Sequence, residues 1–151
     1  MLPQIDRRWL TRQGACKEGK KWYLANCDAD PIKGVKQLLD GGRPDWANWL
    51  LSKLLTGGQN IRYAVYAAKQ VLEIYEEKYP DDRRPRQAIR AVERFLKNPT
   101  PENRAAAYAA NAAYAAAYAA AYAAGAAYAA ADAAMRRKII LYGIRLLKEE
   151  G

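Results

Sequence analysis

Histidine is absent from this chain of 151 residues, and only two cysteines occur, Cys16 and Cys27. Two cysteines without histidine cannot supply the four ligands of a structural zinc site, and they do not define a disulfide framework. The N-terminus also lacks an apolar run of signal-peptide length. We therefore expect no metal, no bound cofactor and a reducing, cytoplasmic location.

Residues suited to catalysis are equally scarce. Without histidine, a general base would have to be a carboxylate, a lysine or a cysteine. The acidic residues lie mainly in turns or beside basic ones, as in EIYEEKYPDDRR, where Asp81 and Asp82 fit a turn or helix cap better than a metal site. Cys16 lies near a predicted helix start without a visible partner base, so a buried structural role is favoured over a nucleophile. We predict that the protein is not an enzyme.

Long runs of large aliphatic residues are missing from the least charged part of the chain. Residues 105–131 carry no charge and would span about 40 Å as a helix, at 1.5 Å per residue. They contain no Leu, Ile, Val or Phe, however, and their tyrosines run through the middle of the segment instead of gathering at its ends. We expect no membrane-spanning segment.

What is present indicates an all-α protein, since hydrophobic residues recur at helical spacing and no stretch alternates with period two. We predict a single domain over residues 1–151. In it, about five short helices over 1–98 pack against one very long alanine- and tyrosine-rich C-terminal helix over 100–149. That last helix is either straight or bent at Gly125.

Several local signals predict where the helices start and stop. We expect Asp30 and Thr100 to cap helices whose first position is proline, and Asp45 to cap a further helix. Thr56-Gly57-Gly58 is expected to end that helix. A helix over residues 83–97 should turn one apolar face to the core, formed by Ala88, Val92, Phe95 and Leu96.

The alanine-rich segment is the most unusual part of the sequence. Of the thirty residues 105–134, twenty-two are alanine and five are tyrosine. At about 100° per residue the tyrosines and the few other non-alanine residues fall on one side of a helix, and methyl groups occupy the other. The stripe that this predicts, excluding Tyr108 at its edge, consists of Asn111, Tyr114, Tyr118, Tyr122, Gly125, Tyr128 and Asp132.

Three interpretations of this stripe stay open. The rings could be ordinary core, with their hydroxyls satisfied by Asn111, Asp132 or the backbone. They could instead form a self-association or partner surface. Finally, Gly125 leaves a notch between Tyr122 and Tyr128 in which rings could stack on a base.

A second candidate surface is a basic ridge in a chain whose net charge is +9. Arg83, Arg86, Arg90, Arg94 and Lys97 follow three- and four-residue steps and would share one helix face. Arginine suits phosphate or carboxylate recognition, so this face is either simply solvated or binds an anion or an acidic partner. There is no groove-reading motif or glycine-rich phosphate loop, so we do not expect sequence-specific DNA binding.

Three stretches together resemble a family of helical immunity proteins found in phages, prophages and bacteria. They are GRPDWANWLLSKLL, IRYAVYAAKQVLEIYEEKYPDDRRPRQAIRAVERFL and the alanine repeat after NPTPENRAAA. The resemblance covers roughly residues 10–148 and implies a role in conflict between phages and bacteria, exerted by binding to a toxin or a defence component. It transfers no functional residue, and for a phage-encoded protein it implies the host cytoplasm.

The leading hypothesis is therefore a non-enzymatic immunity or anti-defence protein that neutralises a protein partner through the tyrosine stripe and the arginine ridge. The alternative is a sponge that sequesters an anionic, cyclic or linear, nucleotide signal between tyrosine and arginine side chains. A third possibility is a structural homo-oligomer, and we expect self-association in any case.

Overall fold

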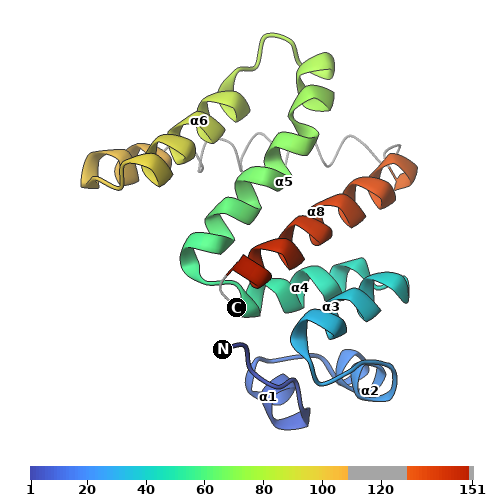
Figure 1. Ribbon diagram of the computed structural model, residues 1–151. Coiled ribbons are helices and arrows are strands. Elements are labelled where there is room, and N and C mark those ends of the chain that lie inside the picture. Colours follow the sequence, from blue (N-terminus) through green and yellow to red (C-terminus); the bar gives the residue numbers. More distant parts are fainter. Residues whose placement is uncertain (109–128, 150–151) are drawn as a thin grey trace. The chain divides into compact units, whose positions relative to one another are not determined.

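The protein is all-α in the part that its computed structural model describes, residues 1–108 and 129–149. Its helices are α1 (Arg7–Arg12), α2 (Lys17–Asn26), α3 (Pro31–Asp40), α4 (Pro44–Leu54), α5 (Gly57–Lys78), α6 (Arg84–Lys97) and α8 (Ala129–Glu149), shown in Figure 1. Residues 101–108 are helical as well. No strand occurs among the described residues, so the predicted fold class is confirmed.

The prediction of one very long C-terminal helix is not supported. The described helical parts of residues 100–149 are 101–108 and α8, and the proposed bend at Gly125 lies outside the described residues. The chain divides into two compact units, unit 1 (Met1–Asn60 with Arg136–Gly151) and unit 2 (Ile61–Met135). The described alanine-rich residues 105–108 and 129–134 both belong to unit 2, and α8 passes into unit 1 at Arg136.

This grouping also differs from the predicted division near residue 99, because the last sixteen residues belong with the first sixty. That the whole chain forms a single domain stays a prediction.

In unit 1, side-chain caps define the first three helices. Asp6 Oδ1 accepts a hydrogen bond from Trp9 N at 2.7 Å, and Asp30 Oδ1 accepts one from Lys33 N at 2.9 Å, which confirms the predicted cap at Asp30. Cys16 Sγ accepts from Gly19 N at 3.2 Å at the start of α2. Cys16 is therefore an exposed helix cap, not the buried residue that we expected.

The start of α4 differs from the prediction. The helix is preceded by Arg43, whose side chain makes no capping hydrogen bond, and Pro44 occupies the first position. Asp45 lies in the first turn instead of at the cap, where its negative charge still favours the helix N-terminus. Asp45 also accepts a hydrogen bond from Arg136 Nη1 at 2.9 Å.

A capping box starts α5, and the sequence analysis missed it. Thr56 Oγ1 accepts from Gln59 N at 3.4 Å, while Gln59 Oε1 accepts from Thr56 N at 2.9 Å. Gly57 and Gly58 consequently belong to the first turn of a helix and do not merely end the preceding one. Gln59 is buried, and its Nε2 donates to the carbonyl oxygen of Leu146 at 2.7 Å.

The core of unit 1 is built from large aliphatic side chains of helices that are distant in sequence. In Figure 1, α3 and α4 lie side by side, and their contact contains several fully buried residues. The same unit buries apolar residues from the last three turns of α8. The buried side chains include Val35, Leu38, Leu50, Leu51, Ile140, Ile144, Leu146 and Leu147.

Unit 2 contains α6, which begins one residue later than predicted, with Arg83 at the N-cap position. Ala88 is buried as expected, Val92 and Phe95 are half-buried, and Leu96 is 36 % exposed, so Leu96 was wrongly assigned to the core. The buried face runs instead through Pro85, Ala88, Ile89 and Ala91. After α6, Thr100 Oγ1 accepts from Asn103 N at 3.2 Å, which confirms the predicted cap.

Candidate functional site

The best-defined candidate site is the cationic side of α6. Its buried residues turn one side of the helix inward, and the three- and four-residue steps of the basic residues place these on the opposite side. Four of the five ridge residues are exposed and form what we call the basic face: Arg83, Arg90, Arg94 and Lys97.

Arg86, the fifth residue of the predicted ridge, has a structural partner. Its Nε and Nη2 donate to the two carboxylate oxygens of Glu76 at 2.7 and 2.6 Å, a bidentate pair that ties α6 to α5. The hydrogen bond from Arg86 lowers the pKa of Glu76, and the positive charges of Arg83 and Arg90 lower it further. Arg86 therefore supports the basic face but is not free to bind a partner.

A second carboxylate fixes the start of α6. Arg84 donates from Nε to Asp82 Oδ1 at 2.8 Å and from Nη2 to Oδ2 at 2.6 Å, and the hydroxyl of Tyr75 donates to Oδ2 at 2.7 Å. These hydrogen bonds hold the pKa of Asp82 well below its ordinary range. In the turn before the helix, Asp82 N donates to the carbonyl oxygen of Tyr79 at 3.1 Å. Asp82 thus has the turn-and-cap role that the sequence indicated.

Acid is expected to weaken this arrangement. The pKa values of Glu76 and Asp82 are lower in the folded chain than their ordinary values of 4.5 and 3.8. The two hydrogen-bonded ion pairs therefore contribute fully to the free energy of unfolding at pH values above the ordinary pKa values. This contribution is lost as the pH falls toward the lower pKa values of the folded chain. We expect the free energy of unfolding, measured by urea titration, to fall with pH below about 4.5.

Two amide variants and one matched control test this pH dependence. Glu76→Gln and Asp82→Asn should each make the acid limb of the stability profile shallower than in the wild type. Asp81→Asn should leave it unchanged, because no hydrogen bond or ion pair joins Asp81 to another described residue. Parallel acid limbs in all four proteins would contradict the assignment.

Within the described residues, no side chain of the basic face forms an ion pair or hydrogen bond of its own, and the charges of Arg83 and Arg90 act on Glu76 only through space. No ion pair or hydrogen bond there involves the side chains of Arg83, Arg90, Arg94 or Lys97. The neighbouring Glu93 pairs instead with Lys69 on α5. Four exposed cations on a helix held by two other ion pairs leave a surface that is ready to bind carboxylates or phosphates.

The predicted tyrosine stripe cannot be placed beside this face. Six of its residues lie outside the described part of the chain: Asn111, Tyr114, Tyr118, Tyr122, Gly125 and Tyr128. Asp132 lies in α8, and its side chain is not described. Tyr108, on the edge of the stripe, is 72 % exposed. The described part of the predicted site therefore consists of the arginines of α6.

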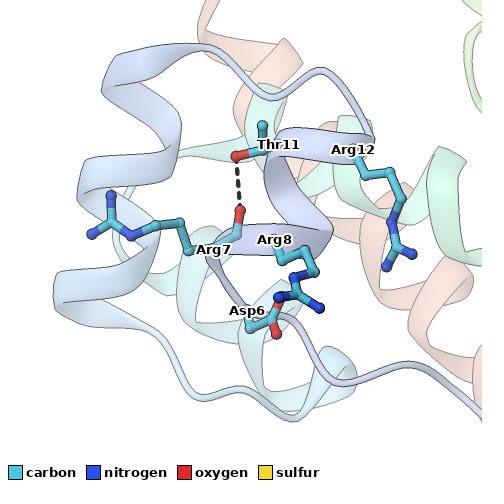
Figure 2. Close-up of a pocket in the computed structure, with 5 residues that line it drawn as sticks. All are labelled: Asp6, Arg7, Arg8, Thr11 and Arg12. Carbon is cyan, nitrogen blue, oxygen red and sulfur yellow. Dashed lines mark hydrogen bonds between the residues drawn. The ribbon is translucent and has the colours of Figure 1, made fainter.

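A second basic surface, which was not predicted from the sequence, lies on α1. A shallow depression there is lined by Asp6, Arg7, Arg8, Thr11 and Arg12. Figure 2 shows that Arg7 leaves the helix on the other side of the view from Arg8 and Arg12, so the three guanidinium groups do not converge on one point. The pattern RRWLTR signals this cationic surface, which serves below as a control.

Aromatic rings gather in unit 1 and were also missed. The rings of Trp22 and Trp46 meet edge to face with centroids 6.0 Å apart. Arg43 Cζ lies 5.7 Å from the Trp22 ring centroid and 4.9 Å from that of Trp46. These distances are typical of cation–π contacts, so Arg43 is held against both rings. The motif GGRPDWANW places Arg43 near Trp46 in sequence, whereas Trp22 comes from α2.

Two further features of the described residues bear on function. No group of three or more Cys, Asp and Glu residues within 1–108 and 129–149 is arranged to hold a metal ion. A search of the described helices finds none with the length and apolar character required to span a bilayer.

Comparison with known proteins gives one match. Residues 34–138 match DUF6931, a family of unknown function. No curated protein matches the chain. No solved structure matches it either.

Proposed function

We propose, from the premise that the chain belongs to the DUF6931 family of unknown function, that it is a non-enzymatic binding protein. Its basic face on α6 docks onto an acidic surface of a protein partner and neutralises that partner. The description of the DUF6931 family names no activity. The proposed biological role, in immunity or anti-defence, therefore rests on the resemblance to phage and bacterial immunity proteins.

The observation that supports this proposal is the set of four exposed cations that form no ion pair or hydrogen bond with a carboxylate among the described residues. Charged side chains across an interface steer association and select the partner by complementarity. Arginine forks match carboxylates in two-point geometry, so an acidic helix or loop is a suitable counterpart. Arg86 and Glu76 keep the helix in place while the basic face engages.

The length of the basic face favours a protein over a small anion. From Arg83 to Lys97 the helix advances about 21 Å at 1.5 Å per residue. One nucleotide can reach only part of that distance, whereas a protein surface can meet all of it. The nucleotide-sponge alternative requires tyrosine rings beside the arginines, and those rings lie outside the described residues.

Charge reversal on the basic face is the direct experiment. We expect the triple variant Arg83→Glu, Arg90→Glu, Arg94→Glu to lose protection in bacteria that express it and are challenged with a panel of phages and toxins. Loss of three complementary charges should reduce protection by at least about tenfold. Arg86 is left unchanged, because its replacement would unpair Glu76 and disturb the contact between α5 and α6.

The matched control is the triple variant Arg7→Glu, Arg8→Glu, Arg12→Glu on α1. Both triple variants lower the net charge from +9 to +3, so they separate a local surface from a general charge effect. The control should keep full protection, and circular dichroism should show that both variants are folded. Equal protection by the wild type and the basic-face variant would overturn the proposal. A nucleotide retained in native mass spectrometry would instead assign the function to nucleotide sequestration.

A further inference from the structure

Unit 1 contains a partly enclosed cavity of about 240 Å³ that is separate from the basic face. Four helices contribute to its wall, α1 to α4, and most of the lining side chains are apolar. Figure 1 shows these four helices at the N-terminal end of the chain. The lining includes Leu10, Cys16, Tyr23, Leu38, Trp46 and Trp49.

Small residues keep this cavity open. Gly14, Ala15 and Gly19 line it where larger side chains would fill it. Gly14 has a φ of +77°, a conformation that residues with a Cβ rarely adopt, so the turn between α1 and α2 favours glycine there. A Cβ on Gly19 would lie 3.1 Å from Cys16 Sγ and 3.9 Å from the Trp46 ring. The sequence thus leaves space beside two large half-buried rings.

The polar atoms of the lining define the chemistry of an occupant. The hydroxyl of Tyr23 donates to the carbonyl oxygen of Asp28 at 2.9 Å, and Cys16 Sγ accepts from Gly19 N, so both groups already have partners. The indole N–H groups of Trp46 and Trp49 have no acceptor among the described residues. The lining therefore offers mainly apolar ring surface, because the polar groups of Tyr23 and Cys16 are already engaged.

Positive charge lies next to both lining tryptophans. Arg43 Cζ is 4.9 Å from the Trp46 ring centroid, and Lys53 Nζ is 5.8 Å from the Trp49 ring centroid. Neither cation lines the cavity itself, but Arg43 is held against the lining ring of Trp46, and its charge favours an anionic oxygen there over a neutral or positive group. The cavity volume is slightly below that of sites for drug-sized ligands, so it suits one fused ring system.

We propose that this cavity binds a small planar aromatic monocarboxylate, with its ring against Trp46 and Trp49 and its carboxylate toward Arg43, the cation beside the Trp46 ring. This inference is independent of the partner that binds the basic face. Six of the ten lining residues precede residue 34, where the match to the family begins. Membership of the family therefore does not by itself predict the cavity.

Isothermal titration calorimetry of the full chain with naphthalene-2-carboxylate tests the proposal. We expect saturable binding with a dissociation constant on the order of 100 µM, a value typical of a ligand of this size. The neutral analogue naphthalene-2-carboxamide should bind about tenfold more weakly, because it lacks the charge that Arg43 favours. Carboxylate binding no stronger than that of the carboxamide would overturn the assignment of an anion site.

Two variants locate the binding. Ala15→Leu should fill the cavity and weaken carboxylate binding by at least about tenfold. Its control, Ala25→Leu, lies on the exposed side of α2 away from the lining and should bind as the wild type does. Arg43→Gln should weaken binding of the carboxylate but not of the carboxamide, and this test holds even if Ala15→Leu does not fold. Unchanged carboxylate binding by Arg43→Gln, absence of saturable binding, or a dimer that covers the cavity would each overturn the proposal.

Discussion

Replacing Gly34 with alanine is expected to lower the free energy of unfolding by about 3 kcal/mol, through overpacking and a lost buried hydrogen bond. A Cβ at this position in α3 would lie 1.8 Å from the hydroxyl oxygen of Tyr23 and 2.7 Å from Cζ of the same ring. Tyr23 is only 3 % exposed, and its hydroxyl donates to the carbonyl oxygen of Asp28 at 2.9 Å. The ring therefore cannot move aside without giving up this contact.

Two effects oppose each other at Gly34. Alanine is a better helix former than glycine by about 1 kcal/mol, so helix propensity alone would make the substitution stabilising. The overlap with Tyr23 is larger, since real Cβ atoms essentially never approach another atom so closely. Tyr23 lies in the interior, and its burial raises the pKa of its hydroxyl above the ordinary value.

Gly58→Ala is the matched control for this prediction. Gly58 lies in the first turn of α5, and a Cβ there would meet no atom within 4 Å. Helix propensity should therefore act alone and raise the free energy of unfolding by up to about 1 kcal/mol. Urea titration followed by far-ultraviolet circular dichroism measures both variants. If Gly34→Ala were as stable as Gly58→Ala, α2 would not pack on α3 through Tyr23.

Leu146→Ala is the second substitution with a large expected effect, a loss of about 3 kcal/mol in the free energy of unfolding. The side chain of Leu146 is completely buried, in the part of α8 that belongs to unit 1. Removing it leaves a cavity among residues that are themselves fixed by the fold. The carbonyl oxygen of Leu146 also accepts the hydrogen bond from Gln59 Nε2, which positions this turn of α8.

Leu141→Ala provides the comparison on the same helix. Leu141 is 43 % exposed, so its truncation should cost less than about 1 kcal/mol. The ion pairs of Arg136 with Asp45 and of Arg137 with Asp40 also join α8 to unit 1, but they are largely exposed and should each contribute less than about 1 kcal/mol. Equal losses from the two leucine variants would contradict the grouping of the end of α8 with the first sixty residues.

Local signals in the sequence predicted the helix starts with mixed success. Asp30 and Thr100 were identified because a capping side chain bonds to a backbone N–H only three residues away. The capping box of Thr56 and Gln59 is an equally local signal. The two glycines between these residues suggested the end of the preceding helix, whereas in the structure they form the start of α5. Asp45 was misplaced because Pro44 already occupies the first helical position.

The candidate site was only partly accessible from sequence for a different reason. The spacing of basic residues predicted a cationic helix face, because residues three and four apart lie on one side of a helix. It could not show that Arg86 reaches Glu76 on the preceding helix, since that pair depends on how α5 and α6 pack. The cavity beside Trp46 was missed because its wall is shared by four helices.

The all-α class, most helix boundaries and the cationic side of α6 follow from the amino-acid sequence alone, because propensity, capping and periodicity act over one or two turns. The tertiary structure pairs Arg86 with Glu76 and leaves the side chains of the basic face without an ion pair among the described residues. It alone also grouped the end of α8 with the first sixty residues and left a cavity beside two tryptophans. Each of these features depends on contacts between helices far apart in sequence, whose geometry is set by packing.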